Sequence, residues 1–135
     1  MNNILKRAVV ILAGAVIYAV HFALGPTLLH LLARFYSEGT LPADMSWRAG
    51  VTVSMAVIDL LVFGIAGFLI GRMWPSGGWF WGLWLAVFPA VAEILLFFTG
   101  VLYPLTMLAT FSATLAGGIA GAHVGATSRN ELVRN

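Results

Sequence analysis

Residues 57–75 read VIDLLVFGIAGFLIGRMWP and contain the two features from which the chain is best interpreted. The first is a single acid, Asp59, within an apolar run. The second is a glycine series, Gly64, Gly67 and Gly71, whose pattern returns later in the chain, where GIAG at 64–67 is repeated at 118–121. A long apolar run predicts a membrane-spanning helix, and small residues at every third or fourth position predict close packing against another helix.

The composition assigns the chain to the membrane proteins. Of its 135 residues, 61% are hydrophobic and only 9% are charged, whereas a soluble domain carries about 25% charged residues. We therefore expect a single integral membrane domain over residues 1–135 with the lipid bilayer as its main partner. The chain has no cysteine, which excludes disulfides and thiolate metal sites. Its few basic residues form no cluster, so we expect no nucleic-acid partner.

Hydropathy predicts an all-α fold, a four-helix transmembrane bundle. A helix needs about 20 apolar residues to cross a hydrocarbon core of about 30 Å. Turn residues divide the chain into runs of that length, and the predicted spans are 8–32, 49–73, 79–99 and 104–126. Gly25-Pro26 should kink or break the first helix, because proline removes a backbone donor and clashes with the preceding turn. The final residues, SRNELVRN, are expected to form a polar tail.

The distribution of charges predicts the orientation of the bundle. One side of the predicted spans carries five of the seven basic residues, namely Lys6, Arg7, Arg72, Arg129 and Arg134. On the opposite side basic and acidic residues balance, namely Arg34, Arg48, Glu38 and Asp44. The positive-inside rule then predicts that both termini are cytoplasmic. The small size of the chain favours a bacterial inner membrane.

Three ionisable residues are expected to face the interior of the bundle. At about 100° per residue, Glu93 shares a face of its helix with Gly82, Ala86 and Pro89. On the first helix, His21 shares a face with Gly14 and Tyr18. Together with Asp59, these positions predict a buried polar cluster.

A buried polar cluster of this kind requires a physical explanation. Placing an ionisable side chain in mid-bilayer costs at least about 2.5–3.5 kcal/mol of insertion free energy. One interpretation is a proton or cation site with Asp59, Glu93, His21 and Tyr18 as candidates. The other is structural, with the acids protonated, hydrogen-bonded or paired with a partner subunit so that they fix helix order. His123 is expected to lie nearer the cytoplasmic surface, outside the cluster.

The repeated small residues are interpreted as helix-packing seams rather than as a pore lining. The residues concerned are Gly64, Gly67, Gly71, Gly117, Gly121 and Gly125. The repetition of GIAG fits either a duplicated two-helix unit or convergent packing, of which convergence is favoured because the first and third spans show no matching identity. The fourth span is small on most sides, which predicts close packing against several neighbours or against a second copy.

No catalytic motif, metal-ligand pattern or cofactor-binding loop occurs in the sequence, so we expect no enzyme, no metal and no cofactor. The leading functional hypothesis is a non-enzymatic membrane protein acting as a homo-oligomer or as a subunit of a larger membrane complex. One alternative is proton- or cation-coupled transport through the Asp59, Glu93 and His21 cluster. A second alternative is a holin-like protein that permeabilises the membrane.

Overall fold

The computed structural model describes residues 2–37, 45–100 and 104–134, and all regular structure in these segments is α-helical. The helices are α1 (Asn3–Ser37), α2 (Met45–Met73), α3 (Phe80–Phe98) and α4 (Pro104–Arg134). Each helix contains a stretch long and apolar enough to cross a membrane. The chain is therefore an all-α, multi-pass membrane protein, and the predicted fold class is confirmed.

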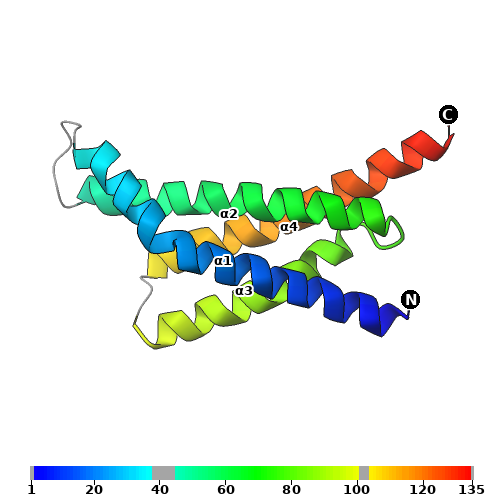
Figure 1. Cartoon of the computed structure of the whole chain (residues 1–135), viewed down its shortest axis with the longest axis horizontal. Helices are drawn as coiled ribbons and strands as arrows, with labels where there is room; N and C mark the ends of the chain where they lie inside the picture. The colour runs from blue at the N-terminus through cyan, green and yellow to red at the C-terminus, as the bar shows by residue number, and fades with distance from the viewer. Residues whose placement is uncertain (1, 38–44, 101–103, 135) are drawn as a thin grey trace.

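Three helices, α1, α2 and α4, run further than the spans expected from hydropathy, and α2 does so by beginning at Met45. Helix α1 passes through Gly25-Pro26 without interruption, and its ribbon changes direction in its second half (Figure 1). Helix α4 continues to Arg134, so that most of the expected polar tail is helical, which the hydropathy argument missed because a helix does not have to end where the apolar run ends. Glu38 and Asp44, used in the charge argument, lie outside the described residues.

The helices alternate in direction, so that both termini lie at the same end of the bundle (Figure 1). We call this the termini end, and the opposite end the far end. Helices α2 and α4 run parallel and share the most extensive interface in the molecule. Helix α3 packs along α4, and α1 lies across α3 with a much smaller interface to α2.

The interface between α2 and α4 places glycine directly on backbone. A Cβ atom added to Gly67 would lie 2.5 Å from the carbonyl oxygen of Gly118, and one on Gly71 would overlap the carbonyl of Ala122. In return, a Cβ on Gly121 would overlap the carbonyl of Gly64. Only glycine fits at these points, because any side chain would push the two helices apart.

This interface explains the repetition of GIAG. The packing of Gly67 on the Gly118 carbonyl is repeated, with the helices exchanged, as the packing of Gly121 on the Gly64 carbonyl. The hydroxyls of Thr52 and Thr106 lie across the same interface 3.0 Å apart and also differ by 54 positions. The two copies therefore pack on each other in one register, as equivalent patches do about a two-fold axis.

The remaining helices join this pair by equally close approaches. A Cβ on Gly82 of α3 would overlap the backbone of Gly118, so this one residue of α4 touches both neighbours. A Cβ on Gly14 of α1 would overlap the carbonyl of Leu85. That carbonyl has no intrahelical donor, because Pro89, four residues on, lacks an N–H. The Cα–H groups of Gly14 cover it instead.

Polar interactions stabilise the packing of the helices at the termini end. The Arg129 guanidinium donates from Nη1 to the carbonyls of Arg72 at 2.8 Å and Met73 at 3.0 Å. These carbonyls belong to the last turn of α2, where no further helical N–H is present to bond them. The Trp81 indole Nε1 donates to the Ser76 carbonyl at 3.3 Å, which joins α3 to the turn before it.

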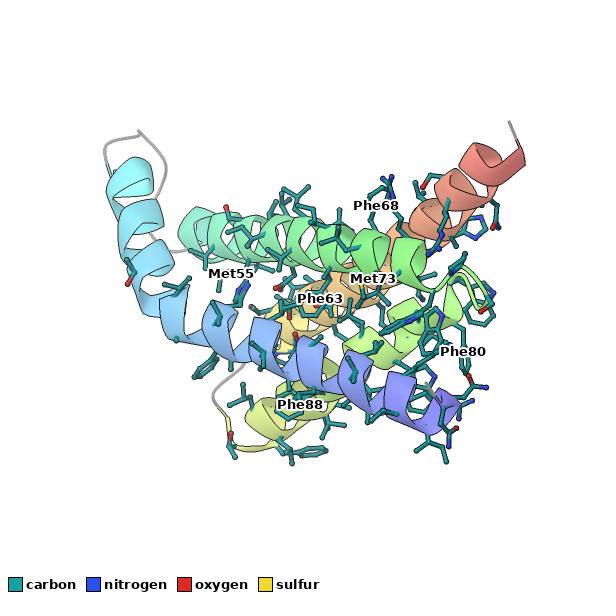
Figure 2. The ribbon with its side chains drawn as sticks, turned by 45° about the vertical axis from the view of Figure 1, so that its right-hand side comes forward. Met55, Phe63, Phe68, Met73, Phe80 and Phe88 are labelled. Carbon is teal, nitrogen blue, oxygen red and sulfur yellow. The ribbon has the colours of Figure 1, made fainter. Side chains whose placement is uncertain are left out.

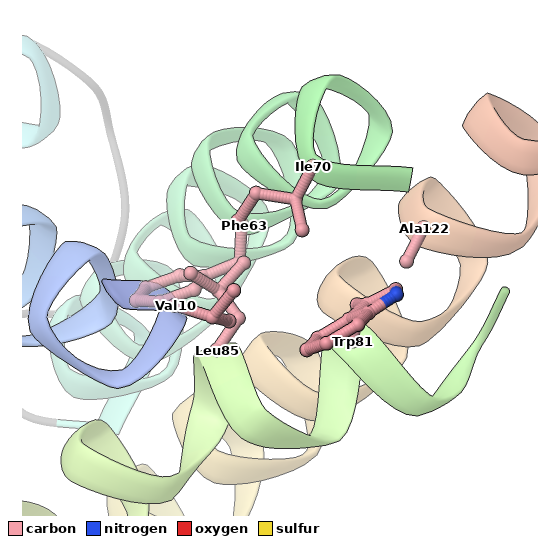
Figure 3. Close-up of a cluster of buried hydrophobic side chains, with 6 residues drawn as sticks. All are labelled: Val10, Phe63, Ile70, Trp81, Leu85 and Ala122. Carbon is pink, nitrogen blue, oxygen red and sulfur yellow. The ribbon is translucent and has the colours of Figure 1, made fainter. Parts of the chain in front are cut away.

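A buried apolar cluster fills the bundle between the points where glycines pack on backbone. It consists of Val10, Phe63, Ile70, Trp81, Leu85 and Ala122 (Figure 3). Phe63 reaches from α2 towards Val10 of α1 and Leu85 of α3, and all three side chains are fully buried. Phe63 also lies inside the bundle in the wider view (Figure 2), whereas Phe68 of the same helix is only partly buried.

The outer surface of the bundle is apolar, as a lipid-facing surface must be. On α1, Leu12 is 64% and Val16 is 56% exposed. On α3, Val91, Leu95 and Phe98 are exposed. Trp84 of the same helix is only partly exposed, and its ring lies 5.2 Å from the guanidinium carbon of Arg7 in a cation–π interaction.

Gly67→Ala tests the glycine seam, with Gly64→Ala as its matched control. The new methyl group at position 67 meets the α4 backbone, so we expect a loss of about 1–3 kcal/mol in the free energy of unfolding. At position 64 the nearest atom is 3.8 Å away, so alanine fits there and leaves stability unchanged or slightly raised. Unfolding in mixed micelles of a mild detergent and SDS measures both, and equal losses would contradict the seam.

Candidate proton or cation site

The first two helices meet where the side chains of His21 and Asp59 contact each other. His21 Nδ1 of α1 lies 3.2 Å from Asp59 Oδ1 of α2, and their side chains are only 11% and 7% exposed. Asp59 lies on a different face of α2 from the glycine seam, so the seam packs on α4 while the acid faces α1, as the helical angles predict.

Glu93 brings a second acid to the same place from α3. It is 3% exposed and lies close enough to Asp59 for the two carboxyls to interact electrostatically. Thr110 of α4 is within hydrogen-bonding reach of the Glu93 side chain. Within the part of the chain that the structure describes, Glu93 Oε2 is buried without a hydrogen-bond partner. This oxygen has accepting capacity that nothing else uses.

Tyr18 closes the cluster on the side of α1. It interacts electrostatically with both Glu93 and Asp59, and its ring packs edge-on against Phe88 of α3 at 6.3 Å and stacks on Phe22 at 6.4 Å. The two aromatic neighbours hold the ring in place, so its hydroxyl end is directed to the acids.

The structure thus brings together Tyr18, His21, Asp59 and Glu93, the four candidates named from the sequence. His123 is exposed on α4 near the termini end, apart from them. The six candidate packing glycines all lie along the α2–α4 interface. Of these, Gly64 differs because a Cβ at its own position would fit. Its carbonyl oxygen is instead the atom on which Gly121 packs.

Sequence reasoning missed the threonines of α4. Thr106, Thr110 and Thr114 recur at every fourth position, so they share one face of the helix. Thr110 is 8% and Thr114 2% exposed, and the Thr114 hydroxyl has no hydrogen-bond partner among the described residues. The signal was the spacing of hydroxyls on a helix whose other faces are apolar, which the glycine pattern obscured.

The donor set decides what the cluster can hold. In the described part of the chain, no three His, Asp or Glu side chains are close enough to hold a metal ion. The His21–Asp59 pair and the neighbouring Glu93 instead provide nitrogen and oxygen atoms between which a proton can be held or passed.

Comparison of the chain with models of protein families, with curated proteins and with solved structures gave no significant match.

The His21–Asp59 pair can be measured by a double-mutant cycle of His21→Leu, Asp59→Leu and the double variant. Removing one partner leaves the other buried and unpaired, which costs about 3–5 kcal/mol for a buried pair. The double variant replaces the pair with packed apolar groups, so we expect it to be more stable than the sum of the single losses predicts. The expected coupling is about 0.5–3 kcal/mol in the free energy of unfolding.

A second cycle that combines Asp59→Leu with His123→Leu serves as the control. His123 is exposed and distant from the cluster, so the two losses should add within about 0.3–0.5 kcal/mol. Equal coupling in both cycles would mean that the His21–Asp59 pair contributes nothing specific.

Proposed function

We propose that this chain is a non-enzymatic membrane protein that moves protons or a small cation across the bilayer through His21, Asp59 and Glu93. The observation that carries the proposal is the environment of Glu93. Its carboxyl is buried among apolar helices, beside a second acid, with one oxygen unpartnered among the described residues. A carboxylate charge is costly in such a place, and binding a proton or a cation removes that cost.

The neighbouring residues support exchange rather than permanent binding. The imidazole of His21 has two ring nitrogens that can carry a proton, and Nδ1 is the one that faces Asp59. A second carboxyl nearby makes it unfavourable for both acids to be charged at once. The cluster therefore supports states that differ by one bound charge, which is what a coupling site requires. The donor atoms present, one imidazole and two carboxyls on three separate helices, suit a proton better than a multivalent metal ion.

The proposal includes an orientation and a location. Lys6, Arg7, Arg72 and Arg129 all belong to the termini end, and by the positive-inside rule we place that end in the cytoplasm. We also propose a bacterial-type inner membrane as its location.

We further propose that the chain works with other subunits, either as a homo-oligomer or within a membrane complex. The support is a face of α4 that carries the small residues Ser112, Ala116 and Ala120, all of them exposed, since small residues favour close helix packing in membranes. The glycine row of α4 does not add to this argument, because α2 of the same chain occupies it. A holin-like function stays the alternative, and it predicts loss of the membrane potential without any need for the two acids.

Transport is tested with purified protein in liposomes that contain a pH-sensitive dye. An imposed membrane potential should acidify or alkalinise the lumen through the wild type, and Glu93→Gln and Asp59→Asn should each abolish that flux. These amides keep the shape of the side chain but cannot bind and release a proton. His123→Ala, at the exposed histidine, should keep the wild-type rate.

Wild-type liposomes that behave like empty liposomes would refute transport. Flux that survives both amide substitutions would instead favour permeabilisation of the holin type.

A further inference from the structure

Polar and apolar side chains are distributed unequally on the two sides of the buried cluster. Helix α4 shows this along a single face, on which positions four apart read Thr106, Thr110, Thr114, Gly118 and Ala122. Hydroxyls occupy the part of this face from the far end to one turn beyond Thr110. From Gly118 towards the termini end, the same face is small and apolar.

The far-end part of this face continues across to α2. The hydroxyls of Thr52 and Thr106 are 3.0 Å apart. Thr110 is one turn from Thr106, about 6 Å along the helix axis, and it reaches the Glu93 side chain. Its hydroxyl donates to the backbone carbonyls of Thr106 at 2.9 Å and Met107 at 3.3 Å, and its oxygen can still accept a hydrogen bond. Thr52, Thr106 and Thr110 thus form a row of hydroxyls that ends at the buried acid.

On the side of the cluster towards the termini end, buried apolar side chains fill the bundle. Val10, Phe63 and Leu85 come from three different helices, and each is 0% exposed. Relative to the site residues of their own helices, all three are displaced towards the termini end. Phe63 is four residues beyond Asp59, and Leu85 is eight residues before Glu93, which correspond to about 6 Å and about 12 Å along the axis. Figure 3 shows these side chains converging at one level of the bundle.

We propose that the site takes up its ion from the far end, along Thr52, Thr106 and Thr110, and that Val10, Phe63 and Leu85 close it towards the termini end. A hydroxyl accepts and donates, so each step of the row can solvate or pass a proton, whereas the three apolar side chains offer no polar atom. This inference rests on the proposed function in one respect, since it names the side from which that site is loaded. The access route itself can be measured without transport.

The absence of native cysteine allows a direct test by thiol labelling. Thr106→Cys and Thr110→Cys are close in size to the native residues and lie on the proposed route. Ala122→Cys is the matched control on the same face of α4, on the termini side of the seal, and is fully buried in the native chain. Thr127→Cys, exposed at the termini end, reports that the reagent reaches that side.

Sealed vesicles are treated with the charged, membrane-impermeant reagent MTSET from one side, and a cleavable C-terminal tag identifies the side of the termini. We expect Thr106→Cys and Thr110→Cys to react from the far side only, Thr127→Cys from the termini side only, and Ala122→Cys from neither. If both route cysteines fail to react from the far side, or if Thr110→Cys reacts from the termini side, the proposed route is wrong.

Phe63→Ala tests the seal by flux. Removing this ring should raise the passive proton leak severalfold, and adding Asp59→Asn should suppress that leak because the leak passes through the site. Leu69→Ala is the control, since this side chain of the same helix is 55% exposed. An unchanged leak in Phe63→Ala would overturn the seal.

The two proposals fail separately. A wild type without flux whose cysteines label as expected would refute transport and leave the access route standing. Normal flux together with labelling of Thr110→Cys from the termini side would support transport and refute the access route.

Discussion

The fold depends on how closely the backbone of α4 approaches its neighbours. In a bilayer, helices gain little from removing apolar side chains from lipid, because lipid is as apolar as the side chains themselves. Association must come from dispersion forces and from weak Cα–H to carbonyl bonds, both of which need backbones that touch. Gly118 meets this requirement twice, since Gly67 of α2 and Gly82 of α3 would each overlap its backbone if they carried a Cβ. The three-helix unit is therefore assembled around one glycine.

The same close packing accounts for the buried acids. Burying Asp59 and Glu93 is unfavourable, and the two acids by themselves would not draw α2 and α3 together. The glycines bring α2, α3 and α4 together at positions set by backbone shape, and the acids are then enclosed because they lie on faces beside the seams. The glycine packing stabilises the fold, and this stability offsets the unfavourable burial of the two acids. A polar site on helices joined only by its own hydrogen bonds would rearrange whenever its charge changed.

Much of this could be predicted from the sequence, because the relevant signals are periodic. The four helices follow from hydropathy, and the burial of Glu93 follows from the small residues one to three turns before it on the same face. The seam of α2 on α4 follows from the glycines at 64–71 and 117–125. The helical region of α4 beyond residue 126 was missed, because polarity ends a membrane span without ending a helix. The packing of Gly14 on Leu85 was not predictable either, since a single chain shows that Pro89 frees a carbonyl but not which helix will cover it.

Helix α1 differs from the other three in what holds it. It packs closely on α3, at Gly14 against Leu85 and at Tyr18 against Phe88, while its interface with α2 is small. The His21–Asp59 pair therefore carries a large share of the attraction between α1 and α2. Since that attraction depends on the charges of the two groups, adding or removing a proton changes the α1–α2 interface far more than it changes the glycine seams, which contain no titratable group. A change of charge at this site therefore affects mainly the packing of α1. The backbone packing of α2, α3 and α4 keeps the acids in place during that change.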